Sequence, residues 1–255
     1  MIPSIWAWFT DPANWQGEDG IPNRTLQHLE YTAMAVLLAS VIAIPLGLWV
    51  GHTGRARWLV SLANSVRAVP TLGLLLAATL WLGAMIQSDL AFTLPSILVL
   101  ALLAIPPILA GTYAGIEAVP PAARDAAKGV GMTSGQVLRQ VELPVGLPLL
   151  LSGLRSAVLQ VVATATVAAY VGLGGLGRYL IDGLALGNYP ATAGGAILVA
   201  VLAVALDGLF ALLQRRVVSP GLTGRRVGGR GKDSRSLAVE ADRPPADVRT
   251  PAAPA

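Results

Sequence analysis

Histidine and cysteine, the residues that most often build metal sites and nucleophilic centres, are scarce in this sequence. The chain has two histidines and no cysteine. We place His28 and His52 separately, each in a loop that flanks an apolar segment. A metal site needs several such ligands together, and a nucleophile needs a neighbouring base. The sequence therefore predicts neither a metal site nor a catalytic nucleophile, and we do not expect an enzyme.

Two glycine-rich patterns resemble nucleotide-binding loops without completing them. Gly172–Gly177 satisfies G-x-G-x-x-G, but it follows an apolar segment rather than a strand, and no acidic residue lies about 20 positions further on. Gly231 and Lys232 lack both the earlier glycine and the following Ser or Thr of a phosphate-binding loop. We expect no cofactor in this chain, so any energy from ATP must come from a partner.

A charged, glycine-containing stretch, "RDAAKGVGMTSGQVLRQVELP" (Arg124–Pro144), lies between two long apolar segments. Such a stretch cannot stay in hydrocarbon, so it must contact water or another protein. Good helix formers over Ala122–Lys128, preceded by two prolines, predict a short helix. Gly129 and Gly131 are expected to end it.

A second short helix should open at Thr133, where Thr133 and Gln136 form a capping-box pattern, and should stop at Pro144. Each of the two helices is shorter than the ~12 to 15 residues that hold alone in water. Either a cytoplasmic protein or the chain's own bundle must therefore pack against them. The apolar and polar sides of the second helix are predicted as Val137, Leu138 and Val141 against Gln136, Arg139 and Gln140.

The composition defines the class of protein. Hydrophobic residues make up 54% of the chain, charged residues 13%, and the mean hydropathy is +0.64, whereas soluble domains carry about 25% charged residues. Helices of about 20 apolar residues span a bilayer. We therefore predict an all-α integral membrane protein with five spans, at Tyr31–Gly51, Ala68–Ser88, Leu90–Ile116, Ser156–Gly177 and Gly183–Leu206.

The distribution of basic residues predicts the orientation. Lys and Arg collect in cytoplasmic loops, which favours an external N-terminus and a cytoplasmic C-terminus in the plasma (inner) membrane. The inner side would then hold most of the basic residues near the bilayer, and the outer side only Arg24 and Arg178. The inner residues are Arg55, Arg57, Arg67, Arg124, Lys128, Arg139 and Arg155.

We divide the chain into three regions: an aromatic external leader at 1–28, the membrane domain at 29–215, and a basic tail at 216–255. In the leader, Ile2, Ile5, Trp6 and Phe9 share one helical face, which indicates either an interfacial anchor or a floppy terminus. The tail is too poor in apolar residues to order itself, so we expect it to be disordered. Membrane lipid is an expected partner, and nucleic acid is not.

The loop spacing resembles a known family. Asp125-Ala126-Ala127, then Gly131, then Val141-Glu142-Leu143-Pro144 is similar to the EAA loop of ABC importer permeases, E-A-A-x3-G-x9-I-x-L-P, with Asp125 and Val141 as conservative departures. Val66–Leu75, Gly111–Pro120 and Ala165–Leu184 extend the similarity, which covers Thr32 to Phe210. The resemblance is to the osmoprotectant branch, which imports glycine betaine, choline, carnitine and related quaternary amines.

This resemblance implies a type I ABC importer permease bundle with five transmembrane helices, like that of methionine permeases. A cytoplasmic ATPase dimer would bind ATP and Mg²⁺, a second permease subunit, either a copy or a paralogue, would complete the pathway, and an external binding protein would deliver the solute. The EAA loop, at 117–144, would fit into a groove of the ATPase and couple it to the bundle. The residues assigned to coupling are Asp125, Ala126, Ala127, Gly131, Val141, Leu143 and Pro144.

Candidate pathway residues recur along the fourth predicted span. Ser152, Ser156, Gln160 and Thr164 form a stripe that either lines a wet route or joins helices. Thr71, just after Pro70, is a weaker candidate. Asp207, an acid inside the fifth span, either attracts a cationic solute or pairs with Arg155 or Arg67.

Two other functions remain open. One is an ABC permease for a different small solute, of methionine or taurine type, whose loop looks similar. The other is an ion-coupled secondary transporter, which would need more intramembrane acids and usually internal repeats. Five spans do not divide into equal repeats, so the ABC importer is the favoured interpretation.

Overall fold

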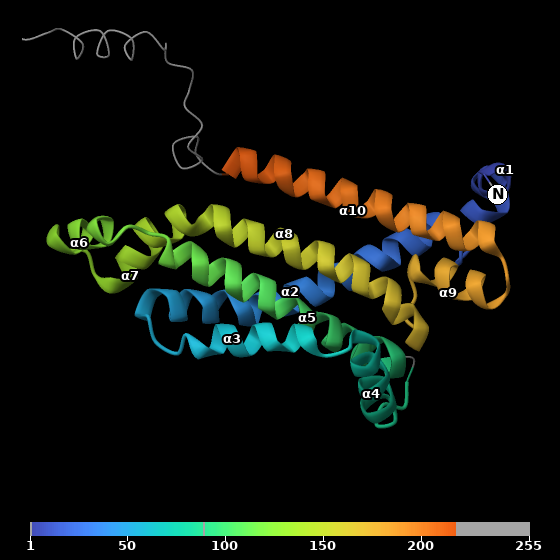
Figure 1. Ribbon diagram of the computed structural model, residues 1–255, viewed down its shortest axis with the longest axis horizontal. Coiled ribbons are helices and arrows are strands. Elements are labelled where there is room, and N and C mark those ends of the chain that lie inside the picture. Colours follow the sequence, from blue (N-terminus) through green and yellow to red (C-terminus); the bar gives the residue numbers. More distant parts are fainter. Residues whose placement is uncertain (1, 89, 218–255) are drawn as a thin grey trace, which may run out of the picture. The chain divides into compact units, whose positions relative to one another are not determined.

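The computed structural model describes residues 2–88 and 90–217, and within this part the chain is helical with no strand (Figure 1). This confirms the all-α prediction. Beyond the described residues lies nearly all of the predicted tail, whose first two residues end the last helix. The helices are α1 (Ile2–Thr10), η1 (Pro12–Trp15), α2 (Ile21–Thr53), α3 (Trp58–Ser65), η2 (Val66–Ala68), α4 (Thr71–Gly83), α5 (Leu90–Glu117), α6 (Pro121–Gly129), α7 (Ser134–Val137), η3 (Leu138–Glu142), α8 (Leu143–Ala168), η4 (Ala169–Val171), α9 (Gly177–Ala185) and α10 (Tyr189–Val217).

Four of the described helical segments are long and apolar enough to cross a membrane: α2, α5, the continuous run Ser134–Val171, and α10. A fifth crossing arises only if the bent pair Trp58–Ala68 and Thr71–Gly83 counts as one span. The two halves of that pair meet at 90°. The described residues therefore hold four continuous spans, and the predicted five only if the broken second one is counted.

The predicted second span, Ala68 to Ser88, is broken at Val69 and Pro70. Val69 is extended, with φ −73° and ψ 130°. Proline disfavours helical backbone in the residue before it and lacks an N–H of its own. The chain therefore turns there. Pro45, Pro95, Pro106 and Pro107, in contrast, lie inside continuous helices, as expected in a membrane bundle.

α5 is the centre of the bundle and packs against both α2 and α8 (Figure 1). Glycines let these helices approach closely. A Cβ atom on Gly111 would lie 2.6 Å from Cα of Gly153, and one on Gly115 would lie 2.5 Å from the carbonyl oxygen of Gly146. In lipid, helices associate through such close contacts rather than through hydrophobic exclusion from water. The α5–α8 contact therefore fixes the core of the bundle.

Pro144 does not end the helix that precedes it, contrary to the prediction. The chain passes from α7 through η3, a π-helical segment, directly into α8. Pro144 falls in the first turn of α8, where a missing N–H is tolerated. The wider π-helical turn supplies the change of register. The second half of the charged stretch is therefore one rod with α8, and the predicted fourth span begins well before Ser156.

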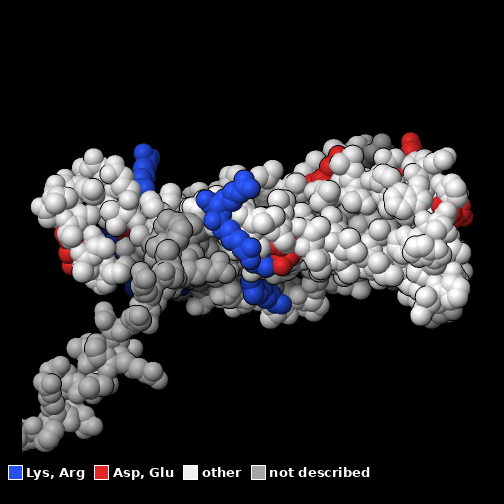
Figure 2. All heavy atoms as spheres, turned by 90° about the horizontal axis from the view of Figure 1, so that it is seen from above, with Lys and Arg blue, Asp and Glu red and all other residues white. Residues whose placement is uncertain are grey.

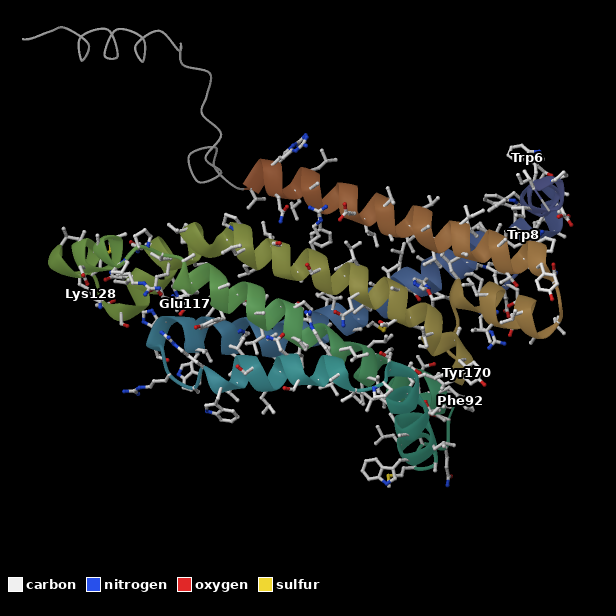
Figure 3. All side chains as sticks on the ribbon, in the orientation of Figure 1. Trp6, Trp8, Phe92, Glu117, Lys128 and Tyr170 are labelled. Carbon is white, nitrogen blue, oxygen red and sulfur yellow. The ribbon has the colours of Figure 1, made fainter. Side chains whose placement is uncertain are left out.

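At the opposite end of the bundle from α6 and α7, α1 packs on α10 (Figure 1). The Trp8 ring lies edge-on to the Tyr179 ring, with centroids 5.2 Å apart, and covers Gly194. Burial raises the pKa of the Tyr179 hydroxyl above its usual value, and this hydroxyl donates to the backbone carbonyl of Asp19. Trp6 is 71% exposed, and Figure 3 labels both tryptophans on α1.

Candidate functional site: the helical turn at one end of the bundle

The turn between α6 and α7 depends on Gly131. Its φ of +85° lies in the left-handed region, which residues with a side chain rarely adopt. Its N–H donates to the carbonyl of Lys128 at 2.9 Å, and the next N–H, of Met132, reaches the carbonyl of Ala127 at 3.1 Å. A Cβ atom there would contact nothing within 4 Å. Backbone conformation, and not lack of space, therefore requires glycine.

The capping box predicted at Thr133 is present. The N–H of Thr133 donates to Oε1 of Gln136 at 2.8 Å, and the Thr133 side chain caps the backbone of Gln136 in return. Val137 then turns into the protein and is fully buried, whereas Gln136, Arg139 and Gln140 stay exposed. The predicted sides of the second helix are thus confirmed, with Leu138 and Val141 half-buried.

The residues assigned to coupling divide between the exposed tip and the junction with the bundle. Asp125, Ala126 and Gly131 are exposed on the tip, whereas Ala127 is buried beneath it. Lys128, labelled in Figure 3, lies on the same short helix. At the junction Val141 and Leu143 are half-buried, and Pro144 is exposed.

A buried carboxylate lies beneath this turn. Glu142 is only 2% exposed, and its Oε1 lies 2.8 Å from Nε of Arg124 in an ion pair. Its Oε2 lies 2.6 Å from Nδ1 of His52, whose Nε2 in turn lies 2.6 Å from Oγ of Ser134. Arg124 also donates to the carbonyl of Ile116 at the end of α5. One carboxylate thus joins side chains from α2, α6 and α7.

This cluster was missed in the sequence, because the π-helical turn changes which residues share a face. In a regular helix the position four residues after Val137 is Val141, and Val141 was expected on the apolar side. The i→i+5 spacing of η3 brings Glu142 to the buried side with Val137. A single acid between Val141 and Leu143 was the only signal in the sequence.

Both histidines lie in α2, and not in loops as predicted. His52 is in its last turn, and His28 is fully buried with Nε2 3.0 Å from the carbonyl of Val162 on α8. α2 begins at Ile21, ten residues before the predicted span, because a helix can continue outside the apolar core, where Arg24 and Glu30 are tolerated. Among the described residues no group of His, Cys, Asp and Glu could hold a metal ion.

The four residues of the polar stripe do not form one continuous surface. Ser152 and Ser156 are exposed on α8. The Gln160 side chain instead donates to the carbonyl of Leu103 on α5 at 2.9 Å, and the Thr164 hydroxyl bonds back to the carbonyl of Gln160 at 2.9 Å. Thr71 starts α4 directly after the break and is half-buried. Ser152 and Ser156 are therefore exposed, whereas Gln160 is hydrogen-bonded to α5 and Thr164 to the backbone of its own helix.

Asp207 is paired with Arg155, one of the two partners considered. Oδ1 and Oδ2 of Asp207 accept from Nε and Nη2 of Arg155 at 2.6 and 2.5 Å, linking α10 to α8. Arg67, the other partner considered, is exposed. The face shown in Figure 2 carries few charged residues over most of its area, as a surface in contact with hydrocarbon requires.

A bundle of long apolar helices around α5, with a short two-helix turn at one end, is the fold of the permease of type I ABC importers. Two solved structures of the MetNI methionine ABC transporter, both inward-facing, share it. Their TM-scores are 0.69 and 0.67, with 22% and 21% sequence identity. The matches cover 82% and 76% of this chain and 100% and 94% of the matched chains.

The chain belongs to the family described as the binding-protein-dependent transport system inner membrane component, whose model matches residues 43–219. It is 32% identical over 204 residues to the glycine betaine/carnitine/choline transport system permease protein OpuCB of Bacillus subtilis, covering 80% of this chain and 91% of the relative. It is 34% identical over 199 residues to the osmoprotectant import permease protein OsmW of Salmonella typhimurium, covering 78% and 92%.

The family defines the broad role of the chain. It is a multi-pass inner-membrane subunit of an ABC importer, a class of transporter that works with a separate ATPase and a binding protein. It is a transporter subunit and not an enzyme.

Proposed function

We propose that this chain is the permease subunit of an ATP-driven importer for compatible solutes such as glycine betaine, choline or carnitine. The observation that carries the proposal is the 32% identity to a glycine betaine/carnitine/choline permease, because the match spans nearly the whole relative. A choline permease of Bacillus subtilis matches at 31% identity and a carnitine permease of Listeria monocytogenes at 35%. Each of these relatives is named for a quaternary amine.

The exposed tip of α6 and the following turn form the surface that meets the ATPase. This assignment is supported by the order of the parts: Asp125 and Ala126 are exposed, Gly131 makes the turn, and η3 continues into α8. A force applied at the tip would reach the bundle through a continuous helix. ATP and Mg²⁺ would be bound by the ATPase, and this chain would bind neither.

The second permease subunit has the same fold as this chain. Bacillus subtilis OpuCB and OpuCD, two permeases named for one transport system, match this chain at 32% identity each. α10 supports the same idea, because no residue in its most apolar window is buried within the chain. An external N-terminus and a cytoplasmic C-terminus, favoured by the positions of Lys and Arg, would direct α6 towards the ATPase.

Solute competition tests the substrate. The permease is reconstituted in liposomes with its ATPase and binding protein, and uptake of labelled glycine betaine is measured against an excess of unlabelled choline, carnitine or methionine. Competition by choline or carnitine but not by methionine supports the proposal. ATP-driven uptake of methionine without uptake of betaine would contradict the proposed substrate and would assign the chain to another branch of the same family.

A further inference from the structure

The side chains around Glu142 form a connected set of polar contacts, in which Nε of Arg124 lies 2.8 Å from Oε1 as an ion pair without a hydrogen bond. A carboxylate can only accept, so the Nδ1 atom of His52, 2.6 Å from Oε2, must carry the proton. In a neutral imidazole Nε2 then accepts, and the hydroxyl of Ser134 is placed at 2.6 Å to donate to it. Glu142 and Arg124 balance one negative charge with one positive charge. His52 therefore bridges Glu142 and Ser134 through its two ring nitrogens.

Separating the side chains of this cluster would cost free energy. Glu142 is 2% exposed, and separating a buried ion pair leaves a charge without compensation. The residues involved come from α2, α6 and α7, and Glu142 itself belongs to the rod that continues into α8. Arg124 adds α5 through the carbonyl of Ile116. Displacing α6 must therefore move the ends of these helices together, or else break the cluster.

We propose that Glu142 is a positioning residue for coupling: it locks the α6–α7 turn to the end of α2 as well as to α8, so that a displacement of α6 reaches both helices. The inference rests on the proposed function. It assigns to Glu142, His52 and Arg124 a role that the exposed tip cannot fill, because Asp125 and Ala126 do not reach α2 by any bond seen in the described residues.

The first test compares Glu142→Gln with Glu30→Gln. Glu30 is an exposed acid on α2, outside the coupling loop, and takes no part in the cluster. Uptake and ATP hydrolysis are measured together in the reconstituted importer. Glu142→Gln should lower the number of solutes moved per ATP by about tenfold, within the range that mutations along a coupling network produce, while Glu30→Gln keeps the parental ratio. A parental ratio in Glu142→Gln overturns the proposal.

The double variant Arg124→Gln/Glu142→Gln separates coupling from folding. It removes both charges, so a loss that arises only from the unpaired Arg124 should disappear. The proposal predicts that the double variant assembles with the ATPase at the parental level yet keeps the low transport ratio. Recovery of the ratio would show that Glu142 acts only by neutralising Arg124, and would contradict the proposal.

Distances provide a readout independent of transport. Because the chain has no cysteine, Thr53→Cys and Lys128→Cys can carry spin labels on the exposed ends of α2 and α6. The distance between the two labels should be the same with and without ATP in the otherwise unaltered permease. The distribution of this distance should broaden when Glu142→Gln is added. A separation that changes with ATP in the unaltered permease overturns the proposal. If the unaltered permease and Glu30→Gln also fail to transport, the proposed function has failed and not the role of Glu142.

Discussion

Arg155 of α8 and Asp207 of α10 form a two-point ion pair inside the part of the chain that spans the membrane, with N–O distances of 2.6 and 2.5 Å. Two parallel contacts fix the relative rotation of the two helices as well as their spacing. α10 also packs against the hydrophobic core through partly buried residues, among them Leu202, Leu206 and Phe210. The pair therefore adds a charged link between α8 and α10 to these apolar contacts.

This relationship predicts the effect of removing one charge. Asp207→Asn should lower the thermal stability of the purified permease because Arg155 loses the partner that links α8 to α10, and Arg155→Gln/Asp207→Asn should lower it less. Unfolding in detergent, followed by circular dichroism, measures both variants. If Asp207→Asn stays stable but loses uptake, the acid serves the solute and the structural role assigned to it is wrong.

Gly131 predicts a defect that comes from the backbone alone. Gly131→Val should strain the turn by about 1–3 kcal/mol, because its φ is +85°, and should uncouple ATP hydrolysis from uptake without removing the protein from the membrane. Gly129→Val is the matched control, since Gly129 also has open space around it but no positive φ. The ratio of solute to ATP in liposomes measures the effect. Equal ratios in the two variants would refute the assignment.

Close contact between α5 and α8 predicts a stability effect at Gly153. Gly153→Ala should destabilise the bundle by about 1–3 kcal/mol through overpacking, because its new Cβ would lie 2.6 Å from the carbonyl oxygen of Pro107. Gly208→Ala, on α10 with nothing within 4 Å, should be neutral or slightly stabilising. Thermal unfolding of the two variants in the same detergent checks this. Equal melting temperatures would contradict the packing described.

The positions of the loops predict the topology. Reporters fused after Arg57 and Gly135 should report a cytoplasmic location, and reporters fused after Gln87 and Gly187 an external one. The turn after α2 and the α6–α7 turn lie at one end of the bundle, and α1 and α9 at the other (Figure 1). An external signal after Gly135 would place the coupling turn where no ATPase could reach it.

Much of this fold was predictable from the sequence, because apolar length and cap chemistry act locally. The apolar run Leu90–Ile116 predicted α5 closely, and Thr133 with Gln136 predicted the start of α7. The run Gly183–Leu206 predicted α10 only in part, because α10 spans Tyr189–Val217. The break before α4 and the continuation through Pro144 were not predictable in the same way. Both depend on how one proline is accommodated by its neighbours: an extended Val69 in the first case, a π-helical turn in the second.

The candidate site shows the same division. The exposed tip could be predicted from the spacing of its residues, because that spacing is read directly from the sequence. The buried cluster was not, because His52 and Glu142 are far apart along the chain and meet only through the packing of α2 against the rod that contains α8. A pairing across helices has no local signature. Asp207 was the exception, since an acid inside an apolar span needs a partner and Arg155 was one of two within reach.

The energy source of uptake tests the central claim most directly. The permease is reconstituted in liposomes with its ATPase and external binding protein, and uptake of labelled glycine betaine is followed with ATP inside and the membrane potential collapsed. Uptake should continue, should require the binding protein, and should be abolished by a substitution in the phosphate-binding loop of the ATPase. Uptake driven by an ion gradient in the absence of ATP would contradict the account.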